Sequence, residues 1–151
     1  MFIFSVDRIE DSEIEKMSKR EDIAMFLSTM LGPECGLWEK CLGRYTDKQG
    51  ISSLEVSFVV YNDDLSLIDG AIFGPVYRQE SILIVDETNK AFLLFADGTK
   101  EPLGKWTKFN DNAEFVRLPE NYTVIGNSFY VCVKDSSQFI DNTLIDVKKG
   151  A

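Results

Sequence analysis

Two apolar stretches, residues 82–85 and 91–96, constrain the fold of this chain more than any other feature. They read Ile-Leu-Ile-Val and Ala-Phe-Leu-Leu-Phe-Ala, and each is apolar on both faces of a strand. The polar residues 86–90 between them predict a hairpin. Strands so close in sequence pair antiparallel, because parallel pairing needs a crossover of a dozen or more residues. Such a hairpin has to be covered on both sides.

A helical segment over residues 8–31 is expected to provide one of these covers. Apolar residues recur at helical spacing toward its end, and Gly32-Pro33 predicts the stop. Ser12 followed by Glu15 fits a capping box, and so does Ser18 followed by Glu21. Two capping boxes so close together indicate either a bent helix or two helices that meet near Ser18.

The rest of the chain favours strands. Residues 2–6 predict a short strand, and residues 34–52 predict a helical turn followed by a loop. From residue 53 the pattern alternates, with Leu54, Val56, Phe58 and Val60 on one face of a strand and Glu55 and Ser57 on the other. Further strands are expected at 65–73, 105–109, 114–118, 122–125, 129–134 and 143–147.

These elements predict an α+β protein, with the N-terminal helical segment packed on a curved, mostly antiparallel sheet or partly closed barrel. A chain of 151 residues is most simply one domain, here 1–151. Its helical part is expected at about 8–31 and its β-rich part at about 53–148.

Composition excludes several kinds of chemistry. The chain has no histidine, the side chain that most often performs acid–base work near neutral pH and most often binds zinc. Its formal net charge is −9, which disfavours direct binding to nucleic acid or to an anionic membrane surface. No serine-hydrolase elbow or phosphate-binding loop is present. We expect no cofactor, and these absences favour binding over catalysis.

The three cysteines, Cys35, Cys41 and Cys132, are an odd number and fit reduced thiols in a cytoplasmic protein. A disulfide between Cys35 and Cys41 is the alternative. The start of the chain lacks a basic leader, and no apolar run is long enough to cross a membrane.

Acidic residues in turns raise a second functional hypothesis, a divalent-metal-dependent hydrolase or nuclease. If they converged, their oxygens could bind Mg²⁺ or Mn²⁺. The simpler interpretation is that aspartate favours turns because its side chain bonds its own backbone. The candidate ligands are Asp63, Asp64, Asp69, Asp86 and Glu87.

The leading hypothesis is a non-enzymatic acidic protein that binds, and inhibits or modulates, a basic protein partner such as a nucleic-acid-handling or host-defence enzyme. An excess of carboxylates steers a protein onto a basic surface. Aromatic anchors at strand ends, among them Tyr61 and Tyr77, are expected to be partly exposed. An immunity protein, a phage-encoded blocker or a structural subunit of a phage assembly would also fit. The candidate partner-binding residues are Asp11, Glu13, Glu15, Asp63, Asp64, Trp38 and Trp106.

Overall fold

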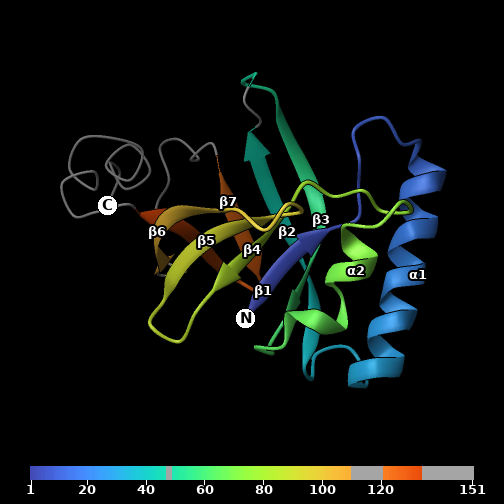
Figure 1. Cartoon of the computed structure of the whole chain (residues 1–151), viewed down its shortest axis with the longest axis horizontal. Coiled ribbons are helices and arrows are strands. Elements are labelled where there is room, and N and C mark those ends of the chain that lie inside the picture. The colour runs from blue at the N-terminus through green and yellow to red at the C-terminus, as the bar shows by residue number, and fades with distance from the viewer. Residues whose placement is uncertain (47–48, 110–120, 134–151) are drawn as a thin grey trace.

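Eight antiparallel strands close into a barrel in the part of the chain that the computed structural model describes, residues 1–46, 49–109 and 121–133. The order around the barrel is β1-β3-β2-β7-β8-β6-β5-β4, and β1 pairs with β4 to complete the circle (Figure 1). The strands are β1 (Phe2–Ser5), β2 (Trp38–Thr46), β3 (Ser52–Val60), β4 (Ser81–Val85), β5 (Lys90–Phe95), β6 (Lys100–Phe109), β7 (Tyr122–Ile125) and β8 (Ser128–Val133).

The short strand β1 is what closes this barrel. Phe2 lies opposite Val60 of β3 on one side and opposite Ile84 of β4 on the other. Closure leaves none of the eight described strands at a sheet edge. The prediction of a mostly antiparallel sheet is therefore confirmed, and the described strands form a closed barrel where the sequence predicted a partly closed one.

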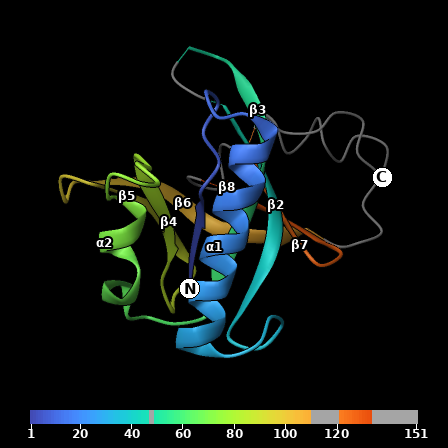
Figure 2. The same ribbon diagram turned by 90° about the vertical axis from the view of Figure 1, so that its right-hand side faces the viewer.

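The long helix α1 (Glu13–Leu31) is continuous and lies against one side of the barrel (Figure 2). Ser12 caps its start, because the Ser12 side chain accepts a hydrogen bond from the backbone N–H of Glu15 at 3.1 Å. It ends at Gly32, which has a φ of 98°. The helix begins five residues later than predicted, and the alternative of two helices meeting near Ser18 is wrong. Ser18 lies inside the helix, where backbone N–H groups already have helical partners.

An outer core holds α1 to the barrel wall. Ile23 and Leu27 of α1 are fully buried against Phe2 and Phe4 of β1 and Phe58 of β3. A short 3₁₀ turn at Leu65–Leu67 and the helix α2 (Asp69–Ile72) close one end of this core. The strand predicted over 65–73 is therefore wrong. The backbone of this segment is fixed by helical turns, in which Asp64 caps the first turn through the N–H of Ser66.

A further correction concerns β2. The residues predicted as a helical turn and loop over 34–52 include the whole of β2, because Trp38–Thr46 pairs with β3 along its whole length. Long-range pairing of this kind outweighs local helix propensity. The predicted strands at 114–118 and 143–147 lie outside the described residues. Among the helices of the described residues, none combines the length and the apolar character needed to span a membrane.

Leu27→Ala tests whether the outer core stabilises the fold. Because Leu27 is fully buried, its truncation should lower the free energy of unfolding by about 2–5 kcal/mol in urea denaturation. Met25 on the same helix is 72% exposed, and Met25→Ala should change that free energy by less than about 0.5 kcal/mol. Equal effects of the two substitutions would contradict the packing described here.

Candidate functional site

Polar side chains line part of the barrel interior. Side chains along a barrel strand alternate between inside and outside, and Val59 of β3 packs in the inner core with Ile3, Leu83 and Trp106. Glu55 and Ser57 therefore share the inward face of β3, whereas Leu54 on the opposite face is 63% exposed at the surface. The sequence pattern correctly separated the two faces of this strand, but the polar face lies in the barrel interior and the outer face is buried only at the end that α1 covers.

Glu55 borders a hollow of about 1120 Å³, to whose lining all eight strands contribute. Aromatic rings form one wall, where Trp106 and Tyr130 are stacked with centroids 5.0 Å apart. Arg8 is the sole cationic side chain on the lining, as far as the described residues go. The hollow is thus strongly acidic, and its carboxylates belong to Asp7, Glu10, Glu55, Glu80 and Glu101.

Glu55 is the half-buried carboxylate of this set that points into the barrel. The hydroxyl of Ser53 donates to its Oε1 at 3.2 Å. Burial raises the pKa of Glu55, and the nearby charge of Asp7 raises it further, whereas hydrogen bonds from Ser53 and Ser5 and the charge of Lys16 lower it. The net pKa lies above the ordinary value, so this carboxyl titrates closer to neutral pH than a surface glutamate.

Tyr45 lies on the adjacent strand with its ring over the backbone of Gly43. A Cβ built on Gly43 would overlap that ring, so only glycine leaves room for it. The Tyr45 hydroxyl is 3.5 Å from the hydroxyl of Thr123 on β7. Burial raises the pKa of Tyr45 to about 12, so the hydroxyl stays protonated at neutral pH. The buried Ser57 hydroxyl lies close enough to influence that pKa but makes no hydrogen bond of normal geometry among the described residues.

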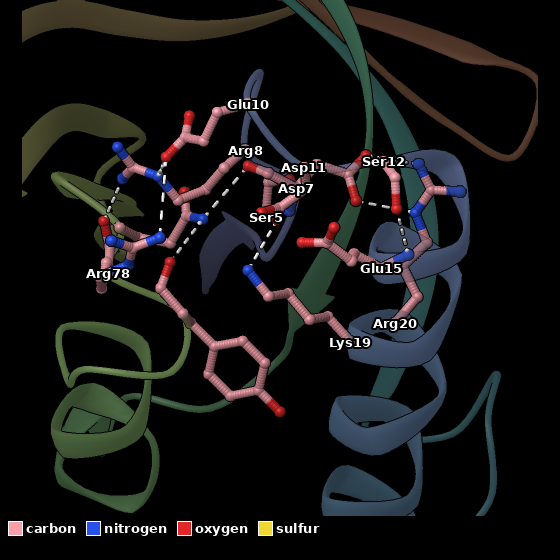
Figure 3. A network of polar contacts seen from close by, with 12 residues as sticks. Ser5, Asp7, Arg8, Glu10, Asp11, Ser12, Glu15, Lys19, Arg20 and Arg78 are labelled. Carbon is pink, nitrogen blue, oxygen red and sulfur yellow. Dashed lines mark hydrogen bonds and ion pairs between the residues drawn. The ribbon is translucent and has the colours of Figure 1, made fainter.

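An ion-pair network joins the hollow to α1 (Figure 3). Arg20 of α1 donates to both carboxylate oxygens of Asp7, from Nε at 2.8 Å and from Nη2 at 2.5 Å. Next to this pair, Lys19 bonds Asp11 at 2.6 Å. The backbone N–H of Asp7 donates to the hydroxyl of Ser5, which itself donates to the carbonyl of Val56. A buried carboxylate at the rim of the hollow is therefore fixed by the helix.

The structure disperses the residues that the sequence nominated for partner binding. Trp38 and Trp106 are buried, the first in the outer core and the second inside the barrel, and Tyr77 is also buried. Of the four aromatic residues expected at the surface, Tyr61 alone is exposed, at 40%. Strand-end aromatics here fill two cores, which is why their exposure was overestimated. The nominated acids lie around α1 and the loop after β3, where Asp11 pairs with Lys19, Glu13 pairs with Lys16, Glu15 begins α1, and Asp63 and Asp64 are exposed.

The turn acids do not form a metal site in the described part of the chain, where no group of three potential ligands is close enough to bind an ion. Asp63, Asp86 and Glu87 do border one small cavity, but Asp69 lies apart at the start of α2. Asp86 Oδ1 accepts hydrogen bonds from the N–H and hydroxyl of Thr88 and from the N–H of Lys90. These contacts are those of turn aspartates that cap their own backbone.

Cysteine chemistry has no support in this site. All three cysteines are free thiols. Burial raises the pKa of Cys41 to about 12 and that of Cys132, which lines the hollow, to about 11. Both are therefore protonated at neutral pH and poor nucleophiles. The predicted reduced state agrees with the structure, and the alternative Cys35–Cys41 disulfide is not formed.

Sequence reasoning missed Glu55 and Tyr45 as site residues. Glu55 was placed with Ser57 on the polar face of a strand, and it was not recognised as a site residue. The glycine two residues before Tyr45 was the other available signal, because glycine within a strand often marks a close approach. Neither signal identifies a barrel interior until the closure of the sheet is known.

The site is thus an acidic hollow with one aromatic wall inside a small antiparallel barrel. Residues 2–133 match the model of the S-Adenosylmethionine lyase family, and the chain belongs to that family. No individual curated protein matches the chain. The match overturns the leading sequence hypothesis: the interpretation as a non-enzymatic acidic inhibitor was wrong, because the family is one of lyases.

Gly43→Ala tests the packing of Tyr45 at the site. The new methyl group must displace the Tyr45 ring, so the free energy of unfolding should fall by about 1–3 kcal/mol. The penalty should shrink when Tyr45→Ala is already present, which a double-mutant cycle by urea denaturation measures. Gly70→Ala is the control, because a Cβ there meets open space. A penalty that is independent of Tyr45 would refute this explanation.

Proposed function

We propose that this protein cleaves S-adenosylmethionine at a carbon–sulfur bond, in the hollow of its barrel. The match of residues 2–133 to a lyase family carries the proposal. The hollow supports it, because S-adenosylmethionine bears a sulfonium and an ammonium against a single carboxylate and is a net cation. Acidic and aromatic linings attract such cations.

Charge decides which reaction suits this hollow. In one balanced step the substrate's own carboxylate oxygen attacks Cγ of the amino-acid arm, a C–O bond forms, and the C–S bond breaks. The electron pair goes to sulfur, giving 5′-methylthioadenosine and homoserine lactone, with no water or external base consumed. Opposite charges on the substrate disappear in this step, and partial removal from water favours their loss.

Elimination is the competing route. It would remove a hydrogen from Cβ, which has no adjacent carbonyl to acidify it, and a carboxylate such as Glu55 is a weak base for that task. Intramolecular displacement requires only that the substrate arm curl so that its carboxylate faces Cγ. Orientation of this kind accounts for large rate increases in intramolecular reactions. A chain without histidine has the groups that this route needs.

Each group of the site then has a distinct part in the proposal. The Glu55 carboxylate attracts the positive charge of the substrate. The protonated hydroxyl of Tyr45, with that of Thr123, provides neutral hydrogen-bonding groups that hold the arm in its curled form. The stacked rings of Trp106 and Tyr130 provide an apolar wall for the adenosyl and methyl groups.

Product analysis tests the reaction. Purified protein incubated with S-adenosylmethionine should yield 5′-methylthioadenosine and homoserine lactone, identified by mass spectrometry. In ¹⁸O-labelled water the lactone collected at early times should carry no label, because water takes no part in the displacement. A vinylglycine product would replace displacement with elimination, and intact substrate would refute the proposed function.

Glu55→Gln should lower kcat/KM by roughly 100-fold or more, because the cationic substrate loses a charged partner in a partly enclosed site. In the unaltered protein, kcat/KM should fall as pH drops through the pKa of Glu55, which burial raises above the ordinary value of a glutamate. A fall of kcat/KM at or below that ordinary value would contradict this role. Glu87→Gln, at an exposed hairpin position, is the matched control and should leave kcat/KM unchanged.

Glu55→Gln, which should lower activity, should raise stability at neutral pH. A carboxyl whose pKa is higher in the folded state binds its proton more tightly there, so its ionisation costs folding free energy as pH rises from the unfolded to the folded pKa. The melting temperature of Glu55→Gln relative to the unaltered protein should therefore be higher at pH 7.5 than at pH 4. A difference that does not vary with pH would show that Glu55 is not strained by burial.

A further inference from the structure

Two carboxyl groups lie on the inner part of the hollow, and the structure treats them differently. Asp7 and Glu55 both line the cavity, whereas Glu10, Glu80 and Glu101 are exposed residues on its border. The Asp7 side chain is 5% exposed and holds two hydrogen bonds from Arg20. Glu55 has hydroxyl partners instead and no cation at ion-pair distance among the described residues.

Arg20 reaches Asp7 from outside the cavity. Its guanidinium comes from α1 and is not part of the lining, so it neutralises Asp7 without occupying the hollow. A bidentate pair of this geometry also fixes the orientation of the carboxylate. The charge of Asp7 in turn raises the pKa of Glu55. Arg20 is thereby connected to the open carboxylate through the charge of Asp7.

We propose that Arg20 is a positioning residue for substrate binding: it neutralises and fixes Asp7, so that Glu55 is the inner carboxylate that meets the sulfonium substrate. The inference rests on the proposed function. Without Arg20 the hollow would hold two unneutralised inner carboxylates, and the full charge of Asp7 would act on Glu55. The substrate cation would then enter a hollow of different net charge, in which the position of its carboxylate partner is less well defined.

Other charged or titratable groups also lie near Glu55 and contribute to its pKa. Asp7 approaches from the segment after β1, Lys16 from α1 and Tyr45 from β2. Arg8, Glu10, Glu80 and Glu101 border the same hollow farther out. Of these groups, the variants below alter Asp7 alone. A change in the titration of Glu55 in those variants therefore reports on the Asp7–Arg20 pair.

The experiment compares three variants of the full chain. The quantity compared is the acid limb of the pH profile, the pH range in which kcat/KM falls as pH drops. Arg20→Met leaves Asp7 unneutralised and should move this acid limb upward by about one pH unit. Asp7→Asn leaves the cation of Arg20 and removes a neighbouring anion, so the limb should move downward by a similar amount. The double variant Asp7→Asn/Arg20→Met removes both charges and should return the limb close to its original position. Arg20→Lys should shift it less than Arg20→Met does.

A purely structural role for Arg20 predicts a different set of results. Each variant would lose stability and activity, and the acid limb would stay in place. Opposite shifts of the acid limb in Arg20→Met and Asp7→Asn support the inference. Acid limbs at the same pH in both variants and in the unaltered protein overturn it. If Arg20→Met fails to fold, the remaining pair decides: Asp7→Asn must move the limb down, and the double variant must reverse that movement.

A second measurement separates this inference from the proposed reaction. NMR titration of the Glu55 side-chain carboxyl, in the unaltered protein and in each variant, needs no catalysis. If S-adenosylmethionine stays intact but Glu55 titrates with the same opposite shifts, the proposed function fails and the role of Arg20 in setting the charge of the hollow holds. If cleavage occurs and neither the limb nor the titration moves, the role of Arg20 fails alone.

Discussion

Closure of the barrel through β1 is the constraint on which the rest of the structure depends. The strand places Phe2 and Phe4 on the outer wall, where α1 covers them, and Ile3 and Ser5 inside. Because β1 pairs with both β3 and β4, the inward face of β3 becomes an interior surface. Glu55 is half-buried as a consequence of that closure, although nothing in its own sequence neighbourhood requires it. The closing strand therefore determines both the packing of the helix and the chemistry of the hollow.

Local signals predicted the parts of the fold that local physics controls. The Ser12 cap, the stop at Gly32-Pro33 and the 82–96 hairpin depend on neighbouring residues, and all three were predicted. Strand β2 depends on its pairing with β3 and was missed. The helical turns at 65–72, which begin at the Asp64 cap, were missed as well. The site was missed because Glu55, Tyr45 and Thr123 come from three strands, which lie side by side when β2 pairs with both β3 and β7.

The absence of histidine misdirected the functional interpretation. It argues against reactions in which a side chain must carry a proton at neutral pH. A sulfonium substrate does not need such a group, because its leaving group departs as a neutral thioether and its own carboxylate can serve as the nucleophile. Under the proposed function the reacting groups belong to the substrate, and the protein's task is to hold and orient it. A composition poor in catalytic side chains is compatible with that task.

The net charge of −9 does not by itself explain how a cation would be bound in one orientation. A uniformly acidic surface attracts a cation from about one Debye length but cannot orient it at contact. Orientation requires one open carboxylate among others whose charge is already neutralised. Around the hollow, Arg20 and Lys19 are committed to Asp7 and Asp11, and Arg8 is committed to Glu10. These ion pairs leave Glu55 as the half-buried carboxylate of the hollow without a paired cation among the described residues, while Glu80 and Glu101 are exposed. Under the proposed function, the pattern of pairing, more than the total charge, directs the cation to Glu55.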